Sequence, residues 1–568
     1  MEKEKLILTG NPVSPGIAMA KAYVYYPLEL VVEEGYFAKE AKQENMAAFR
    51  NAFEKTKEEL EQLYAGLAEE DPEKAKIFLA HRELLEDEEI LEEIQMAIED
   101  ECMNPDYAVD KVFDEFSILL SKVADPLIAG RAVDLQDVKR RVIRIYQGKE
   151  EKNLSNLTED VIVIAHDLLP SDTATLNRQR VKGIITEIGG SNSHSAILAR
   201  SFQIPAVLGV SDAMKEIPEG ALLGMDALSG ILIVNPDEEE TTVLEEKKLS
   251  FLKKRQTEEE YLDKPGRLKD GTLVEIGINV GSSDFDVPKT NFDFVGLFRT
   301  EFLYMENTHL PTEEEQFEAY KKVIQNAKGN PVTLRTLDIG GDKTLPYMEL
   351  PKEENPFLGN RALRLCFAEP KIFMTQLRAA LRASAYGPLQ IMFPMVGSME
   401  DIYRAKAYVK EAMEQLEQER EAFDKDIKIG IMIEVPSIAL IADMAAEEVD
   451  FASIGSNDLT QYVCATDRMN PEVAEYYQNY SPAMIRLLGY IAQSFAEKGK
   501  ALSVCGEMAG NPNIAVVLAG LGIKKLSMSA ANIAGVKAAL AQVSLGEAKE
   551  LAARCKATKT EEEILGGI

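Results

Sequence analysis

The sequence predicts a multidomain α/β protein whose C-terminal part is a (β/α)8 TIM barrel. Eight short, almost continuously apolar runs follow one another after about residue 270, and helical patterns or long loops separate them. Buried parallel strands have this composition, and eight β/α units in about 300 residues match the size of such a barrel. The runs span residues 273–280, 293–298, 332–338, 389–396, 427–435, 451–456, 501–507 and 524–530.

A second β/α pattern lies nearer the N-terminus. Residues 1–30 contain short strand-like runs around a turn, and four more apolar runs bounded by Gly, Pro and Asp lie between residues 158 and 235. The clearest helix among them begins after Gly190. We expect the opening strands to join the later ones in one sheet, so that residues 1–30 and 148–235 form one β/α domain.

The intervening residues 31–147 predict an inserted helical subdomain. Long polar helices there carry an apolar stripe at three- and four-residue steps, which is typical of helices that pack on one face. The stripe indicates a helical core, arranged as a bundle or as a pair of hairpins. Its first members are Met46, Phe49, Phe53, Leu60 and Leu63.

A charged segment over residues 236–262 predicts a linker helix. Pro236 stands near its first turn, the acidic residues come first and the basic residues last. This order complements the helix dipole. The barrel domain would then occupy residues 263–568, and the linker and Gly266 are candidate hinges.

The overall charge restricts the classes of partner. Asp and Glu total 95 against 63 Lys and Arg, a formal net charge of −32. Nucleic acids and anionic membranes require a basic face, so both are disfavoured, whereas a basic protein partner would be steered toward the chain. For most of the charge, a role in solubility alone is an equally good explanation.

The cysteines and the N-terminus favour the cytoplasm. The five cysteines are scattered, without a CxxC pair, which disfavours structural zinc and a disulfide framework. The opening MEKEKLILTGNPVSPG lacks an apolar signal core, and no apolar run is long enough to insert in a membrane.

Polar residues gather where the predicted barrel strands end, and active sites of such barrels lie at the C-terminal ends of the strands. A single arginine there is often a structural salt bridge, but several converging on one face indicate a binding site. Following the strands in order, these residues are Arg299, Glu301, Arg335, Asp338, Lys343, Glu434, Asn457, Asp458, Cys505 and Glu507, with Arg361 and Arg468 in loops.

Their chemistry fits a substrate with both phosphate and carboxylate groups. The paired N–H donors of an arginine guanidinium match the oxygens of either group. Glu434 and Asp458, from neighbouring strands, could hold Mg²⁺, which would neutralise a transferring phosphoryl group. Phosphoenolpyruvate is such a substrate. Cys505 is either a buried small apolar residue or a proton donor to an enolpyruvate carbon.

His194 occupies an unusual position in the stretch EIGGSNSHSAILARS. Ser191, Asn192 or Ser193 can cap the helix that follows Gly190, which places His194 in or near the first turn. The positive helix end favours a neutral, nucleophilic imidazole that can carry a phosphoryl group. The alternative is a histidine that merely forms hydrogen bonds at a helix start.

The other three histidines do not follow glycines at a predicted helix start. We interpret His166 as a structural residue and His81 as a possible surface contact, and we assign no role to His309.

Taken together, the motifs resemble the Enzyme I family of the bacterial sugar phosphotransferase system. The members of this family are phosphoenolpyruvate–protein phosphotransferases, related to pyruvate phosphate dikinase and phosphoenolpyruvate synthase. The resemblance covers essentially the whole chain, including the opening SPGIAMAKAYV. It is carried by PSDTATL, GGSNSHSAILAR, GLFRTEFLY, RTLDIGGDK, NPFLGNRALR, IMIEVPS, SNDLTQY and CGEMAG.

The resemblance implies a role for each site residue. His194 would be phosphorylated through Nε2, with Thr173 nearby, and would pass the phosphoryl group to a histidine of the phosphocarrier protein HPr docked on the helical insertion. Cys505 would protonate the enolate and release pyruvate. The family forms homodimers through the barrel. Phosphoenolpyruvate would be bound by Arg299, Arg335, Arg361, Asn457 and Arg468, and Mg²⁺ by Glu434 and Asp458.

One departure concerns the active histidine. The related proteins usually read GG-x-T-S-H, commonly with Arg in the x place, whereas Ser191 and Asn192 stand in this chain. The rate of transfer or the choice of carrier could therefore differ.

Two other functions are compatible with parts of the sequence. An ATP-using dikinase or synthase would need a nucleotide-grasp domain, for which the chain is too short, and no Gly-rich phosphate loop followed by Lys and Ser/Thr is present. A phospho-state signalling scaffold is permitted by the residues beside His194, but the complete barrel site argues against it.

Overall fold

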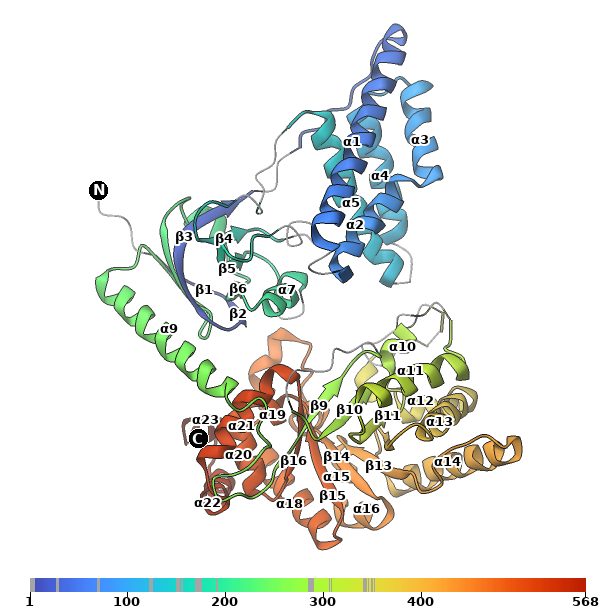
Figure 1. Cartoon of the computed structure of the whole chain (residues 1–568), viewed down its shortest axis with the longest axis vertical. Coiled ribbons are helices and arrows are strands. Elements are labelled where there is room, and N and C mark those ends of the chain that lie inside the picture. Colours follow the sequence, from blue (N-terminus) through green and yellow to red (C-terminus); the bar gives the residue numbers. More distant parts are fainter. Residues whose placement is uncertain are drawn as a thin grey trace. The chain divides into compact units, whose positions relative to one another are not determined.

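The computed structural model divides into two compact units, Met1–Lys254 and Arg255–Ile568 (Figure 1). Each unit is described by itself. The model describes the chain except for residues 1–5, 27–29, 69–71, 122–125, 150–153, 155–156, 169–175, 191–192, 284–290, 306, 308, 341–344, 346, 349–350, 352 and 568.

The first unit contains an eight-stranded mixed sheet in the order β1-β8-β7-β3-β4-β5-β6-β2. The opening strands pair with the later ones, as predicted, and β3, β4, β5 and β6 run parallel. The strands are β1 (Leu6–Thr9), β2 (Asn11–Ser14), β3 (Ile17–Tyr25), β4 (Val161–Ala165), β5 (Val181–Thr186), β6 (Ala206–Leu208), β7 (Leu222–Asp226) and β8 (Ile231–Val234).

Two elements of this sheet region were absent from the sequence prediction. Strand β7 has no alternation of polar and apolar residues, yet it pairs with β3 on one side and with β8 on the other. It is buried almost throughout, and its Leu223 and Met225 belong to the hydrophobic core of this sheet. The four-residue helix α8 (Ala213–Glu216) was also missed, since so short a helix has no periodicity to detect.

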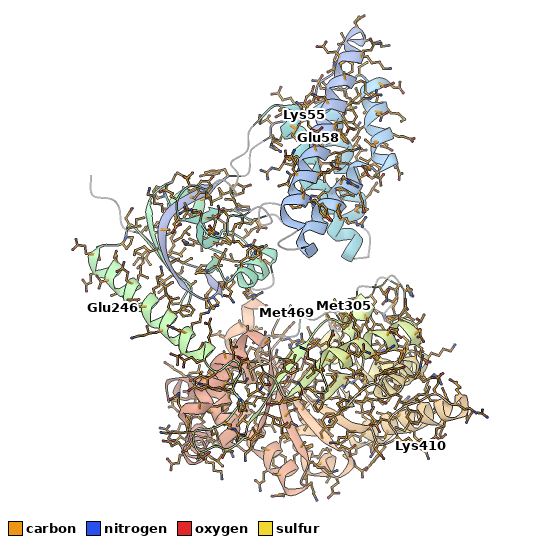
Figure 2. The ribbon with its side chains drawn as sticks, viewed as in Figure 1. Lys55, Glu58, Glu246, Met305, Lys410 and Met469 are labelled. Carbon is orange, nitrogen blue, oxygen red and sulfur yellow. The ribbon has the colours of Figure 1, made fainter. Side chains whose placement is uncertain are left out.

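Five long helices separate β3 from β4, as predicted for the insertion. Phe49, Phe53 and Leu60 of α1 are buried in a common core, whereas Lys55 and Glu58 on the same helix stand out from it (Figure 2). The helices are α1 (Lys42–Ala68), α2 (Pro72–Leu85), α3 (Glu88–Glu99), α4 (Pro105–Ser121) and α5 (Pro126–Tyr146).

The interpretation of His81 as a surface contact is wrong. The imidazole is fully buried, with Nε2 3.4 Å from Oδ1 of Asp134 and Nδ1 3.7 Å from Oδ2 of Asp137. Its ring also meets Phe78 edge-on. His81 lies three residues after Phe78, and that spacing puts both side chains on the inner face of α2.

Helix α9 (Glu238–Glu259) forms within the predicted linker. Leu244 is its single buried residue, and all of α9 is described. Nζ of Lys247 lies 2.6 Å from Asp226 in the sheet. Beyond the helix, the carbonyl of Leu262 accepts a hydrogen bond from the buried ammonium of Lys537. Glu246 projects into solvent (Figure 2).

The second unit contains a closed barrel of eight parallel strands, β9 to β16, in sequence order. Seven of the eight predicted apolar runs contain a whole strand, and the run 293–298 contains all of β10 except its last residue, Arg299. Helices surround the barrel (Figure 1). The TIM-barrel prediction is therefore confirmed. The strands are β9 (Glu275–Val280), β10 (Phe294–Arg299), β11 (Val332–Arg335), β12 (Leu389–Phe393), β13 (Lys428–Ile433), β14 (Phe451–Gly455), β15 (Ala501–Cys505) and β16 (Lys525–Met528).

Four helices of the second unit lie close to the strand ends in the sequence. Helix α10 (Glu301–Met305) directly follows β10, and α17 (Ser456–Cys464) directly follows β14. Helix α11 (Glu313–Asn326) precedes β11, and α13 (Pro370–Ser384) precedes β12. All five cysteines are free. In the described part of the chain, no helix combines the length and apolar character needed to cross a bilayer.

Candidate active site

The predicted site residues meet at the C-terminal ends of the barrel strands. Arg299 ends β10 and Arg335 ends β11, and the two are register partners on neighbouring strands. Glu434 directly follows β13, Asp458 lies in the first turn of α17, and Cys505 ends β15. Because parallel strands share one carboxyl edge, residues far apart in the sequence converge there.

Arg335 is held by two acidic side chains. Its Nη2 lies 2.8 Å from Oε1 of Glu301, and its Nη1 lies 3.0 Å from Oδ2 of Asp338. All three residues are buried. Burial alone would lower the pKa of Arg335, but the two carboxylates outweigh it and raise the pKa. The guanidinium is therefore always charged and fixed in orientation.

Asp338 also binds Arg361. Its Oδ1 accepts hydrogen bonds from Nη2 and Nε of Arg361, at 2.8 and 3.2 Å. Nη1 of Arg361 then reaches Oδ1 of Asp458 at 3.3 Å. A single alternating chain of charges thus joins β11 to α17, and each buried charge in it has an opposite partner.

Arg299 differs from these two arginines. Its side chain is exposed, and no carboxylate of a described residue forms an ion pair with it. The surrounding protein and the neighbouring charge of Arg335 lower the pKa of Arg299. An arginine in this position can bind an anionic ligand without first breaking an internal ion pair.

Glu434 is fully buried, and only one of its carboxylate oxygens has a partner among the described residues. Oε1 accepts a hydrogen bond from the backbone N–H of Met395 at 2.6 Å, whereas Oε2 has none. Burial, followed by the charges of Asp458 and Asp338, raises the pKa of Glu434 to about 8. Gly455 makes room for this carboxylate, because a Cβ atom there would lie 2.7 Å from Oε2.

Glu434 and Asp458 provide oxygen ligands suited to a hard divalent cation. A cation would satisfy Oε2 of Glu434 and relieve the repulsion that raises its pKa. The described residues contain no group of three or more His, Cys, Asp or Glu that could enclose a metal by themselves. Further ligands would therefore have to come from water or from a bound substrate.

Cys505 and Asn457 lie beside one another at the ends of β14 and β15. The Cys505 thiol is buried and donates to the carbonyl of Ile454 at 3.6 Å, and burial raises its pKa. Oδ1 of Asn457 accepts the backbone N–H of Glu507 at 3.3 Å. Gly506 permits this approach with a φ of +140°.

Arg468 lies beside Asp458. Its Nη1 lies 3.6 Å from Oδ2 of Asp458, and its side chain remains partly accessible. The hydroxyl of Tyr477 donates to the carbonyl of Asn457 at 2.9 Å. Burial is the main reason why the pKa of Tyr477 rises to about 12, so this hydroxyl stays protonated.

His194 is the first residue of α7 (His194–Phe202), at the carboxyl edge of β5 in the first unit. Ser193 is the N-cap, because its hydroxyl accepts the backbone N–H of Ala196 at 3.3 Å. The hydroxyl of Ser195 donates to Asp167 at 3.2 Å and ties the first turn to the loop after β4. The predicted helix start is thereby confirmed, with Ser193 as the cap among the three candidates.

Some predicted residues fall outside the described part of the chain. These are Thr173, Ser191, Asn192 and Lys343. His166 is largely exposed, and its Nδ1 lies 2.8 Å from Oε2 of Glu187.

Three family models match the chain. They describe the N-terminal part of phosphoenolpyruvate-utilising enzymes over residues 9–131, their mobile domain over residues 157–230, and their phosphoenolpyruvate-binding domain over residues 255–545. A phosphoenolpyruvate-protein phosphotransferase of Bacillus subtilis (strain 168) is 43% identical over 564 residues, which cover 99% of each chain. One of Staphylococcus carnosus (strain TM300) is 41% identical over 98% of each chain.

The chain belongs to the phosphoenolpyruvate-protein phosphotransferase family. It is therefore a transferase, as the motifs predicted. Among solved structures, the NMR solution structure of an Enzyme I (nEIt) protein matches 43% of this chain and 99% of its own length, with 40% identity and a TM-score of 0.41.

In this member of the phosphotransferase family, sequence reasoning missed two groups that complete the site. The hydroxyl of Tyr462 lies 3.4 Å from Nη1 of Arg361, and the N–H of Met395 binds Glu434. Tyr462 follows Asp458 by four residues, so helical spacing in SNDLTQY placed both on one face. A backbone donor such as the N–H of Met395 leaves no signal in a sequence.

Proposed function

We propose that this enzyme transfers the phosphoryl group of phosphoenolpyruvate to His194 and then to a histidine of a small phosphocarrier protein, HPr. The barrel mouth carries the proposal. It combines Arg299, which forms no ion pair with a described residue, and the fixed Arg335 with the buried carboxylates of Glu434 and Asp458. A substrate with phosphate and carboxylate groups requires such a set.

In the first step, Nε2 of a neutral His194 attacks phosphorus and a nitrogen–phosphorus bond forms. The bond between phosphorus and the enol oxygen breaks, and the electron pair leaves with the enolate. Arg299 and Arg335 stabilise the negative charge of the phosphoryl and carboxylate oxygens, with Arg361, Asn457 and Arg468 assisting. The preference of a helix N-terminus for anions supports the placement of the phosphoryl group at His194.

Cys505 completes the reaction by giving its proton to the methylene carbon of the enolate, which becomes pyruvate. The raised pKa of this thiol keeps it protonated and ready to donate. The thiolate then recovers a proton from water.

Glu434 and Asp458 would hold a divalent cation, for which we propose Mg²⁺. When bound, the ion supplies charge neutralisation for the transferring phosphoryl group. Oε2 of Glu434, which lacks a described partner, supports this assignment.

We assign the parts of the chain as follows. Residues 1–30 and 148–235 form the phosphohistidine domain, residues 31–147 the HPr-binding subdomain, residues 236–262 the linker, and residues 263–568 the substrate-binding and dimerisation domain. His194 has to meet both the barrel mouth and the carrier, so we infer a swivelling movement about the linker. A cytoplasmic location accords with this role.

Mass spectrometry after mixing the protein with phosphoenolpyruvate and magnesium tests the proposal. An acid-labile phosphate on His194 is expected, and His194→Ala should bind phosphoenolpyruvate without retaining phosphate. Stoichiometric phosphate on another residue of that variant would contradict the assignment.

Two further measurements separate the alternatives. An ATP-dependent synthase would bind ATP in a direct titration, and we expect no binding. A signalling scaffold would not pass label from phosphoenolpyruvate to HPr over many turnovers, whereas the proposed enzyme would.

A further inference from the structure

A single buried amide links the ends of two barrel strands outside the site described so far. Gln376 of α13 is fully buried. Its Oε1 accepts the backbone N–H of Leu337 at 2.8 Å, and its Nε2 donates to Oγ1 of Thr300 at 3.1 Å and to Oη of Tyr320 at 3.1 Å. Both amide hydrogens and the amide oxygen therefore have partners.

Two of these partners are neighbours of the substrate-binding arginines. Thr300 follows Arg299 directly, and Leu337 lies two residues after Arg335. The hydroxyl of Thr300 also donates to the carbonyl of Arg335 at 3.0 Å. Gln376 and Thr300 thus connect the end of β10, the end of β11 and helix α13 through hydrogen bonds that no water reaches.

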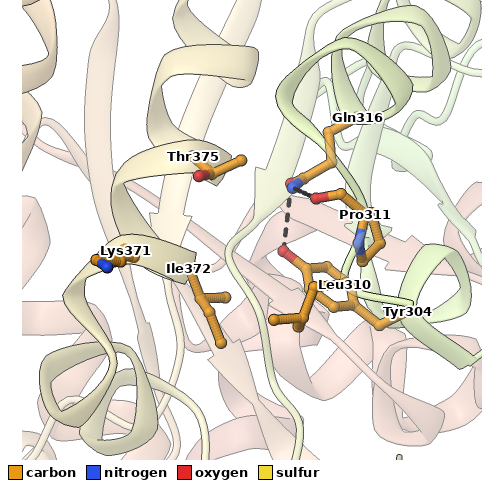
Figure 3. A pocket seen from close by; sticks show the side chains of 7 residues that line it. All are labelled: Tyr304, Leu310, Pro311, Gln316, Lys371, Ile372 and Thr375. Carbon is orange, nitrogen blue, oxygen red and sulfur yellow. Dashed lines mark hydrogen bonds between the residues drawn. The ribbon is translucent and has the colours of Figure 1, made fainter. Parts of the chain in front are cut away.

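The network continues away from the barrel mouth. The hydroxyls of Tyr320 and Tyr304 both donate to Oε1 of Gln316, at 2.9 and 3.2 Å, and Nε2 of Gln316 donates to the carbonyl of Pro311 at 2.9 Å. Figure 3 shows this outer end, where Tyr304, Gln316 and Pro311 line a small cavity. The fixed direction of each bond leaves Gln376 a single amide orientation.

We propose that Gln376 is a positioning residue, which holds Arg299 and Arg335 at the spacing that the phosphate and carboxylate of the substrate require. The inference rests on the proposed function, since it concerns the same substrate. Without the amide, the N–H of Leu337 would lack a buried partner. The strand ends would keep their backbone pairing and the bond from Thr300 to Arg335, but they would lose their attachment to α13 and could shift. Small displacements of binding groups are costly for catalysis.

Gln376→Met tests the inference, because Met keeps the length of the side chain and removes its hydrogen bonds. We expect kcat/KM for phosphoenolpyruvate to fall roughly tenfold or more, chiefly through a higher KM. The matched control is Tyr320→Phe. It breaks two bonds of the same buried network but leaves the bonds from Gln376 to Thr300 and Leu337 in place.

We expect Tyr320→Phe to lower stability while KM stays within about twofold of the unchanged protein. Thr300→Val should resemble Gln376→Met, and Thr300→Ser, which keeps the hydroxyl, should restore KM. Equal KM values in Gln376→Met and Tyr320→Phe would overturn the inference.

Amide hydrogen exchange of the protein without substrate gives a readout that does not depend on the reaction. The N–H of Leu337 should exchange faster in Gln376→Met than in Tyr320→Phe, and equal rates would also overturn the inference. If the unchanged protein used no phosphoenolpyruvate, the proposed function would fail, and this exchange experiment would still decide whether Gln376 fixes the strand ends.

Discussion

Arg299 and Arg335 are adjacent register partners with opposite environments. Arg335 is buried between Glu301 and Asp338, whereas Arg299 is exposed and without an ion pair to any described residue. A buried ion pair contributes little net stability, but removing one partner leaves an uncompensated charge. The two arginines therefore differ: Arg335 belongs to a buried ion-pair network, whereas Arg299 can bind an anionic ligand without first breaking an ion pair to a described residue.

Alanine substitutions should separate these roles. Arg335→Ala should lower the free energy of unfolding by about 3–5 kcal/mol, because it leaves buried carboxylates unpaired. Arg299→Ala should change it by less than about 0.5 kcal/mol yet weaken phosphoenolpyruvate binding strongly. Urea denaturation and calorimetric titration measure the two quantities. Similar destabilisation by both variants would contradict this division.

Glu434 should make the metal-free protein less stable as pH rises. Its pKa is about 8 in the folded state, above the ordinary value of 4.5. Its contribution to stability is therefore complete below the ordinary pKa and is lost as pH rises to the folded one. Between pH values of about 5 and 8 the loss is at most about 1.4 kcal/mol per pH unit.

Glu434→Gln removes this titration, so the free energy of unfolding should depend less on pH in that interval. Urea denaturation in a chelator at several pH values measures it, with the exposed Glu421→Gln as the control. An unchanged slope in Glu434→Gln would show that the carboxyl titrates normally.

At the scale of elements, the C-terminal end of β14 is shaped around a carboxylate. Gly455 is the last residue of this strand, and any side chain there would press on Glu434. The glycine therefore serves close packing rather than a turn.

Gly455→Ala should displace the Glu434 carboxylate and weaken magnesium binding by roughly tenfold or more, since altered support of a ligand typically has that effect. Metal titration measures it. Gly566→Ala is a suitable comparison for glycine loss away from the site, because no atom lies within 4 Å of a Cβ there and its φ lies outside the left-handed region. Equal magnesium affinity in both variants would contradict the prediction.

The barrel strands could be predicted from the sequence because buried parallel strands are continuous apolar runs with glycine, proline or polar boundaries. The site residues could be predicted because strand ends are local features. The ion pairs between these side chains could not be predicted. The sequence spacing of Asp338, Arg361 and Asp458 does not indicate that Asp338 binds two arginines or that Arg361 also binds Asp458. Gln376 was missed because the sequence alone gives no sign that a polar glutamine in an amphipathic helix is buried.

Two features of the first unit were also misjudged from the sequence. His81 was interpreted as a possible surface contact, yet its helical spacing from Phe78 places it in the core. Strand β7 was missed because its five residues, LLGMD, neither alternate nor form a continuous apolar run, although Leu223 and Met225 lie in the core.

At the scale of the whole molecule, the two compact units have separate hydrophobic cores. We therefore expect two thermal transitions in calorimetry. Phosphoenolpyruvate with magnesium should raise one of them by several degrees, because a ligand stabilises only the unit that binds it. Arg299→Ala should abolish the shift and His194→Ala should preserve it. A shift of both transitions together would show that the units unfold as one.

Helix α9 has a consequence for any movement between the units. Its early part is tied to the sheet through Leu244 and Lys247, and the chain just beyond it is tied to the barrel through Lys537. A continuous rod of 22 residues is about 33 Å long, so a tilt of about 20° at one end carries the other end through about 11 Å. If one anchoring contact loosened slightly, the far end of the helix would therefore move by about the diameter of a helix.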